Sequence, residues 1–111
     1  MGLFVESQGP IKFASFAASS SGNNSVISAV TSKQIRVLSY VVVATSAVTL
    51  KFCSGTSGPT DLTGAMPLGA NGGVSAAFSP AGWFETASGA ALSVTLGGAV
   101  AVAGHITYQE V

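Results

Sequence analysis

The stretch that most constrains the fold is residues 34–52, which reads QIRVLSYVVVATSAVTLKF. β-Branched and aromatic residues crowd it, and only the small polar pair Thr45-Ser46 interrupts it, so it predicts two strands joined by a tight turn. Strict alternation divides the first strand into two apolar faces, with Ile35, Val37, Val41 and Val43 on one and Leu38, Tyr40 and Val42 on the other. A strand that is apolar on both faces needs cover on both sides. The second strand alternates as expected for one buried face, which would hold Val48, Leu50 and Phe52.

The rest of the chain repeats this pattern of short apolar runs between turn-forming residues. Strands are predicted within residues 11–17, 25–30 and 74–78, with loops at 19–24 and 54–61. Residues 62–68 carry Gly64 and Pro67 and are expected to form an edge strand or an irregular segment. The stretch from Leu92 to Tyr108 reads as a hairpin that turns at Gly97-Gly98, and Gly104 on its apolar face suggests a bulge or a close neighbour. We therefore expect an all-β, antiparallel, jelly-roll-like β-sandwich of about eight short strands with no substantial helix. Residues 1–10 are expected to form an N-terminal arm and residues 11–111 a single β-sandwich domain.

The shortage of charge is the most informative feature of the composition. Charged residues make up 7% of the chain, with four basic and four acidic side chains and a net charge of zero, against roughly a quarter in an average soluble domain. Such a chain lacks the basic surface that binds nucleic acid or an anionic membrane, so neither is expected as a partner. Low charge also protects poorly against self-association. We expect a homo-oligomer or larger assembly, and the alternative is a monomer hydrated by its Ser, Thr, Asn and Gly residues.

Three apolar residues near the N-terminus, Leu3, Phe4 and Val5, are candidates for contact with a neighbouring subunit. The first residues lack a basic start and a long apolar run, so no signal peptide is expected. Tyr40 on the apolar central strand is a further candidate contact residue.

No pattern in the chain points to catalysis. His105 is the only histidine, and the sequence has no Gly-x-Ser-x-Gly nucleophile elbow. We interpret His105 as a strand residue on a sheet or subunit surface, where it is a candidate contact residue; an enzyme centred on His105 is the least favoured alternative. Glu85 and Glu110 would be the acid and nucleophile of a glycosidase only if the fold brought them together. The expectation is a protein that is not an enzyme and has no catalytic residues and no cofactor.

Metal binding is not expected either. One histidine, one cysteine and four scattered carboxylates give no zinc-like spacing. Asp61 in its Gly/Ser/Thr loop would be a single carboxylate for a calcium ion, which is a weak site. We interpret Cys53 as a small buried residue.

Trp83-Phe84 follows a turn and has two readings. The favoured one is a plug at the end of the sandwich core; the other is an exposed Trp83 that stacks on a sugar ring or a partner.

Several stretches together resemble small, mostly uncharacterised proteins of tailed bacteriophages and prophages. They are QIRVLSY at 34–40, LTGAMPL at 62–68, ANGGV at 70–74, GWFET at 82–86 and GHITY at 104–108. The resemblance covers roughly residues 24–111 and includes no catalytic motif. It implies a virion component, as in the jelly-roll trimers that decorate or cement phage heads. The expected partners are then further copies of the chain, in a trimer, and virion proteins such as the major capsid protein. The expected location is the virion after synthesis in the host cytoplasm. A receptor- or glycan-binding module of a tail fibre or baseplate, using Trp83 or the loop 55–61, is the alternative.

Overall fold

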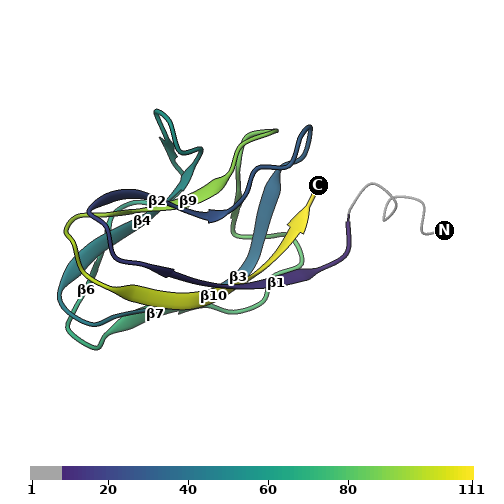
Figure 1. Cartoon of the computed structure of the whole chain (residues 1–111). Helices are drawn as coiled ribbons and strands as arrows, with labels where there is room; N and C mark the ends of the chain where they lie inside the picture. The colour runs from purple at the N-terminus through teal and green to yellow at the C-terminus, as the bar shows by residue number, and fades with distance from the viewer. Residues whose placement is uncertain (1–8) are drawn as a thin grey trace.

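The fold consists of two antiparallel sheets packed face to face. The computed structural model describes residues 9–111, and within these it has strands and no helix, so no helix is long and apolar enough to cross a membrane. The ten strands are β1 (Lys12–Ala18), β2 (Gly22–Ile27), β3 (Ile35–Ala44), β4 (Val48–Ser54), β5 (Thr60–Asp61), β6 (Met66–Leu68), β7 (Gly73–Ala76), β8 (Phe84–Glu85), β9 (Leu92–Leu96) and β10 (Val102–Glu110). Sheet A has the order β1-β10-β3-β7, with β8 also on β3, and sheet B has the order β2-β9-β4-β5, with β6 also on β4. Figure 1 shows the two layers.

This strand order is that of a jelly roll. β5 and β6 both pair with β4, and β7 and β8 both pair with β3. Counting each of these two sets as one position leaves eight strand positions. Numbered along the chain, they run first-eighth-third-sixth in sheet A and second-seventh-fourth-fifth in sheet B. The predicted all-β jelly-roll sandwich of about eight short strands is therefore confirmed.

The predicted hairpin between Leu92 and Tyr108 is wrong. β9 pairs with β2 and β4 in sheet B, whereas β10 pairs with β1 and β3 in sheet A. The chain at Gly97-Gly98 therefore crosses from one layer to the other. The two strands of residues 34–52 are separated in the same way, since β3 lies in sheet A and β4 in sheet B. Alternation shows only that each strand has an apolar face. Two apolar faces are buried equally well when the strands are neighbours in one sheet and when they face each other across the sandwich, so the pattern does not distinguish the two arrangements.

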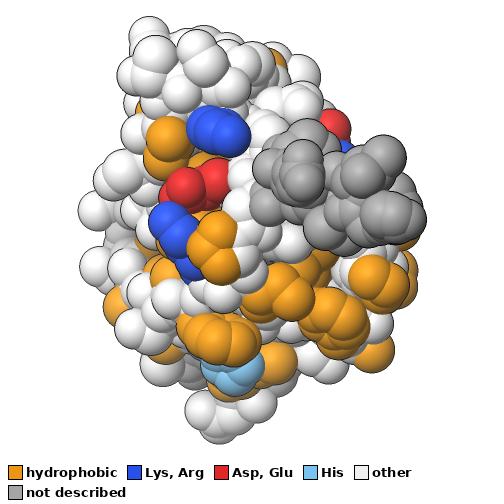
Figure 2. Space-filling view, turned by 90° about the vertical axis from the view of Figure 1, so that its right-hand side faces the viewer, with side chains coloured by type: hydrophobic (Ala, Val, Ile, Leu, Met, Phe, Trp, Pro, Cys, Tyr) orange, Lys and Arg blue, Asp and Glu red, His pale blue; other side chains and the backbone are white. Residues whose placement is uncertain are grey.

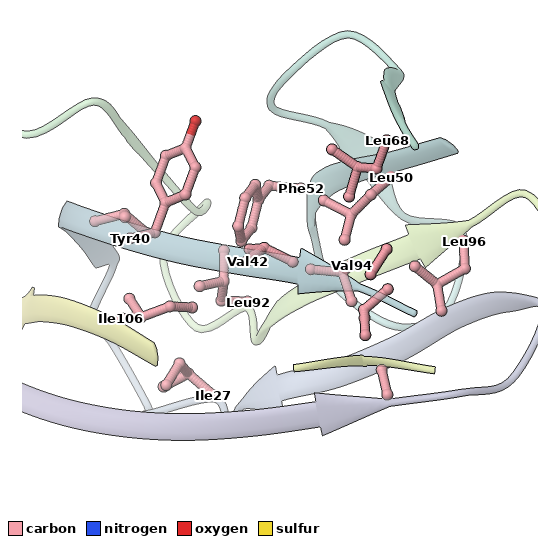
Figure 3. Close-up of a cluster of buried hydrophobic side chains, with 14 of the residues drawn as sticks. Ile27, Tyr40, Val42, Leu50, Phe52, Leu68, Leu92, Val94, Leu96 and Ile106 are labelled. Atoms are coloured by element: carbon pink, nitrogen blue, oxygen red, sulfur yellow. The ribbon is translucent and has the colours of Figure 1, made fainter. Parts of the chain in front are cut away.

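The core lies between the sheets and is made almost wholly of aliphatic and aromatic side chains. Figure 3 shows side chains from both layers meeting there. The fully buried members include Ile35, Val42, Leu50, Phe52, Leu92, Val94, Leu96 and Ile106. The rings of Tyr40, Phe52 and Phe84 contact one another, with centroids 4.9 to 6.0 Å apart. Within residues 9–111 no buried side-chain nitrogen or oxygen lacks a hydrogen-bond partner.

A β-bulge changes the faces of β3. Thr107 pairs with Ser39 and Tyr108 with Val37, so Leu38 is an extra residue on β3. Val37 and Tyr40 therefore both join the core, and Val41 and Val43 point outward. Leu38 is buried but lies outside the core cluster, at the point where the β7–β8 connection bonds to β3 through Ser79 N–H and Leu38 O. The predicted faces were wrong because strict alternation does not allow for an extra residue.

The predicted bounds of strands and loops agree with the structure in part. The predicted loop at 19–24 is wrong in its second half, because β2 begins at Gly22 and Asn23 donates hydrogen bonds to Ser93 (2.9 Å) and Thr95 (3.2 Å) across the ladder. β1 covers most of the first predicted strand, and β6 with Pro67 lies at a sheet edge, bonded only to β4. The strand predicted at 25–30 ends at Ile27, and the loop predicted at 54–61 includes the end of β4 and the short strand β5. A four-residue turn closes from Gly72 N–H to Gly69 O.

Candidate interaction surface

The two sheets present opposite chemistry to their surroundings. The outer face of sheet B is polar: Ser93 Oγ donates to Gly55 O at 2.7 Å, and Lys51 forms an ion pair with Asp61 at 3.0 Å. Cys53 is fully buried in this face, with its Sγ 3.4 Å from Thr95 Oγ1, and this confirms it as a small buried residue. These polar groups form hydrogen bonds and ion pairs with one another, so they leave few polar groups free to bind a ligand.

Sheet A exposes a surface with no charged residue, which we call the outer patch. It consists of the residues of β1, β10, β3 and β7 that alternate with the core-facing residues and point away from the core. They are Phe13, Ser15, Ala17, Ala103, His105, Thr107, Ser39, Val41, Val43 and Ser75. The strand register sets them in rows, such as Ser15–His105–Val41–Ser75. The ion pair between Arg36 and Glu85 (2.8 Å) lies on β3 and β8, beyond the bulge. The outer patch is therefore a surface without Asp, Glu, Lys or Arg, in which five apolar side chains lie among Ser, Thr and His side chains.

One end of the outer patch opens into a groove of about 570 Å³. Its floor includes the row Ala17–Ala103–Val43, and its walls come from the connections after β1, β3 and β9. Thr45 joins two of these connections, because its N–H and its hydroxyl both donate to Ala101 O at 3.0 Å. Every lining residue is Ala, Val, Ser, Thr or Asn. The groove can therefore accept an apolar group without confronting it with a charge.

The opposite end of the outer patch carries the most exposed large apolar side chain of residues 9–111. Phe13 is 79% exposed, and Ile11, two residues before it on the same side, is 45% exposed. The other exposed large apolar residues are Val43, in the groove, and Phe78 and Trp83, in the β7–β8 connection. An aromatic ring left this far in water is a strong candidate for burial against a partner.

Of the sequence-predicted contact residues, His105 lies where expected. It is exposed at the centre of the outer patch, between Ser15 and Val41, and this confirms a strand histidine on a sheet surface. Figure 2 shows hydrophobic side chains beside the pale-blue histidine and between it and the charged side chains of that view.

Tyr40 does not lie on the surface. Its ring packs in the core at 9% exposure, and burial raises the pKa of its phenol above the usual value. Its predicted role as a contact residue therefore has little exposed side chain to support it. Leu3, Phe4 and Val5 lie outside the described residues.

Trp83 and Phe84, which were interpreted together from the sequence, differ in the structure. Phe84 packs against the core, as a plug would. Trp83 is 53% exposed, and its indole N–H donates to Ala77 O at 2.7 Å, so the plug reading is wrong for this residue. The loop 55–61 is exposed, as predicted, although Thr60 and Asp61 pair with the end of β4.

Three carboxylates of residues 9–111 are each held in an ion pair with a Lys or Arg side chain. Asp61 pairs with Lys51, Glu85 with Arg36, and Glu110 with Lys12 at 3.0 Å. The hydrogen bond from Lys51 holds the pKa of Asp61 below its usual value. No group of three or more His, Cys, Asp or Glu side chains in this part of the chain could hold a metal ion. The carboxylates are thus engaged in ion pairs, including the two considered for a glycosidase.

Sequence reasoning missed both Phe13 and the groove. The alternation of residues 11–17 put Phe13 on one face of a strand, but gave no sign of which face would meet the core. The groove combines residues 17–20, 24, 43, 45 and 101–103, which are distant in sequence, so only the sheet order brings them together.

No protein-family model, curated protein or solved structure matches this chain.

Proposed function

We propose that this chain is a structural protein of a bacteriophage particle, acting as a homotrimer that decorates or cements the head. Its partners are other copies of itself and a virion protein such as the major capsid protein, and its role is adhesion and not catalysis. Each copy contributes modest contacts, and the symmetric oligomer multiplies them. The proposal rests on the resemblance of residues 24–111 to phage proteins and on the surface of sheet A.

The observation that carries the proposal is the outer patch. A protein that works alone in water rarely leaves a continuous area of apolar side chains exposed. The outer patch contains no Asp, Glu, Lys or Arg; its apolar side chains lie among Ser, Thr and His, and it combines a 79% exposed phenylalanine at one end with a mostly apolar groove at the other. Enzymes instead gather titratable groups in a pocket, and the carboxylates of residues 9–111 are each held by a cation.

The first test is the absolute mass of the purified protein, measured by light scattering behind a sizing column across a dilution series. We expect a trimer that persists on dilution. The second test is co-sedimentation with heads of the encoding phage that lack this protein, where we expect saturable binding. A protein that stays monomeric and does not sediment with such heads would contradict the proposal.

A second candidate function is a receptor- or glycan-binding module of a tail fibre or baseplate. It is favoured by Trp83, whose exposed ring is fixed by the hydrogen bond to Ala77 and so is ready to stack on a sugar. A glycan array would reveal binding that Trp83→Ala abolishes and Phe78→Ala, a change at another exposed ring of the same connection, leaves intact. An array without any signal that depends on Trp83 or on the loop 55–61 would remove this candidate.

A further inference from the structure

We propose that Phe13 of one copy inserts into the groove at the other end of the outer patch of a neighbouring copy. This inference rests on the proposed function in one respect, because it names the contact by which the copies of a virion protein associate. The ligand of the groove is thus an aromatic side chain from a second molecule of this chain.

The groove suits an aromatic ring in size and in chemistry. Its volume of about 570 Å³ exceeds the roughly 150 Å³ of a cavity that holds a benzene ring, so the groove has room for the Phe13 ring together with the neighbouring Ile11. Ala17 and Ala103 keep the floor open, and Val43 adds an apolar surface that is 47% exposed. Ser19, Ser20 and Asn24 line it on the β2 side and are neutral. A charged group would lose hydration in the groove without gaining an ion-pair partner, whereas a neutral aromatic ring has no charge to desolvate.

The ring of Phe13 matches this groove and cannot fill the groove of its own chain. Phe13 and Ala17 lie on the same face of β1, and the strand rise of about 3.3 Å per residue separates them by about 13 Å. A phenylalanine side chain is too short to span that distance. Neither Phe13 nor the lining of the groove carries a charge, and Ile11 near Phe13 provides a second exposed apolar side chain. A Phe13 ring in this groove therefore has to come from another copy.

A projection at one end of a face and its receptor at the other end give a head-to-tail contact. Such a contact, repeated from copy to copy, forms a closed ring when the rotation closes and an open chain when it does not. The proposed trimer is the closed form. Within such an assembly each molecule inserts its own Phe13 into one neighbour and receives the Phe13 of another. His105 and Val41 lie on the surface between these two points of contact.

The experiment removes the two halves of the contact separately and measures mass by light scattering across a dilution series. Phe13→Ser removes the ring, and Ala103→Arg fills the groove and adds a charge to it; both sites are exposed, so both variants should fold. We expect each to raise the dissociation constant by about 10- to 100-fold, the range for exposing a buried aromatic side chain. The matched controls are Phe78→Ser, the same change at another exposed phenylalanine, and Ala103→Ser, which leaves the groove open. Both controls should keep the wild-type mass, and circular dichroism should show the same strand content in all four variants.

Mixing the two defective variants gives the sharper result. Phe13→Ser retains an intact groove and Ala103→Arg retains the Phe13 side chain, so an equal mixture should form heterodimers at protein concentrations at which each variant alone is monomeric. A Phe13→Ser protein with wild-type mass, a mixture that stays monomeric, or an equal loss in Phe78→Ser would overturn the inference.

Head binding separates this inference from the proposed function. If association depends on Phe13 but the protein never binds heads, the contact stands and the virion role fails. If the protein binds heads while Phe13→Ser leaves its mass unchanged, the virion role stands and the contact fails.

Discussion

At the scale of single residues, Gly104 shows how closely β10 and β3 approach. A Cβ added at Gly104 would collide with the backbone oxygen of Val41 and come within 3.0 Å of Val42 Cα. Because the obstacle is backbone, the two central strands of sheet A would have to separate. The sequence suggested a close neighbour or a bulge at this glycine; the close neighbour is confirmed, and the bulge of this strand pair lies between Thr107 and Tyr108.

Gly104→Ala should therefore destabilise the fold by about 1–3 kcal/mol, the usual cost of forcing a methyl group into a packed site. Gly98→Ala is the matched control, since a Cβ there meets nothing within 4 Å; it should be neutral or slightly stabilising. Urea unfolding followed by tryptophan fluorescence measures both. Equal midpoints for the two variants would contradict the close approach.

At the scale of elements, the sequence predicted where strands occur better than how they pair. Alternation of apolar residues located β1, β3, β4, β9 and β10, and Pro67 marked an edge strand. It did not reveal the extra residue Leu38, because a bulge depends on the partner strand. It also could not distinguish a hairpin at Gly97-Gly98 from a crossing between layers, since both bury the same apolar faces. Polar pairing across the ladder, as at Asn23, left no hydrophobic signal at all.

The short strand β8 is fastened to β3 by the residue that follows it. Thr86 is 1% exposed; its Oγ1 accepts a hydrogen bond from Ile35 N–H at 2.9 Å, and its own N–H donates to Ile35 O at 3.0 Å. Thr86→Val keeps the shape but leaves the Ile35 N–H buried without this acceptor, which should cost about 1–3 kcal/mol of the free energy of unfolding. Thr86→Ser keeps the hydroxyl and should lose less. Urea unfolding compares the three proteins, and a Val variant as stable as the wild type would show that the hydrogen bond contributes nothing net.

At the scale of the whole molecule, the candidate site is a product of topology. The jelly-roll order brings the connections after β1, β3 and β9 to one end of sheet A, and the groove lies between them. The sequence predicted an assembling, charge-poor sandwich, but each segment of the groove reads by itself as an ordinary turn. The same topology brings the two ends of the described chain together, because Gly9 N–H donates to Glu110 O at 3.1 Å and Gln109 donates to Gly9 O.

Adjacent ends predict that the domain tolerates circular permutation. A permutant that joins Val111 to Gly9 through a short glycine linker, omits residues 1–8 and opens between Ser57 and Gly58 should fold with a free energy of unfolding within about 2 kcal/mol of the wild type, since only loop lengths change. The loop 55–58 suits the new ends because it is exposed and a Cβ at Gly55 or Gly58 meets nothing within 4 Å. A second permutant opened at Gly82 should be much less stable, because that turn packs on the Arg36 side chain and its Trp83 N–H bonds to Val37 O at 2.8 Å. Urea unfolding of both permutants is the measurement. If the first failed to fold while a linear chain of residues 9–111 folded, the order of strand formation along the chain, and not only the final set of sheet contacts, would decide whether this jelly roll is reached.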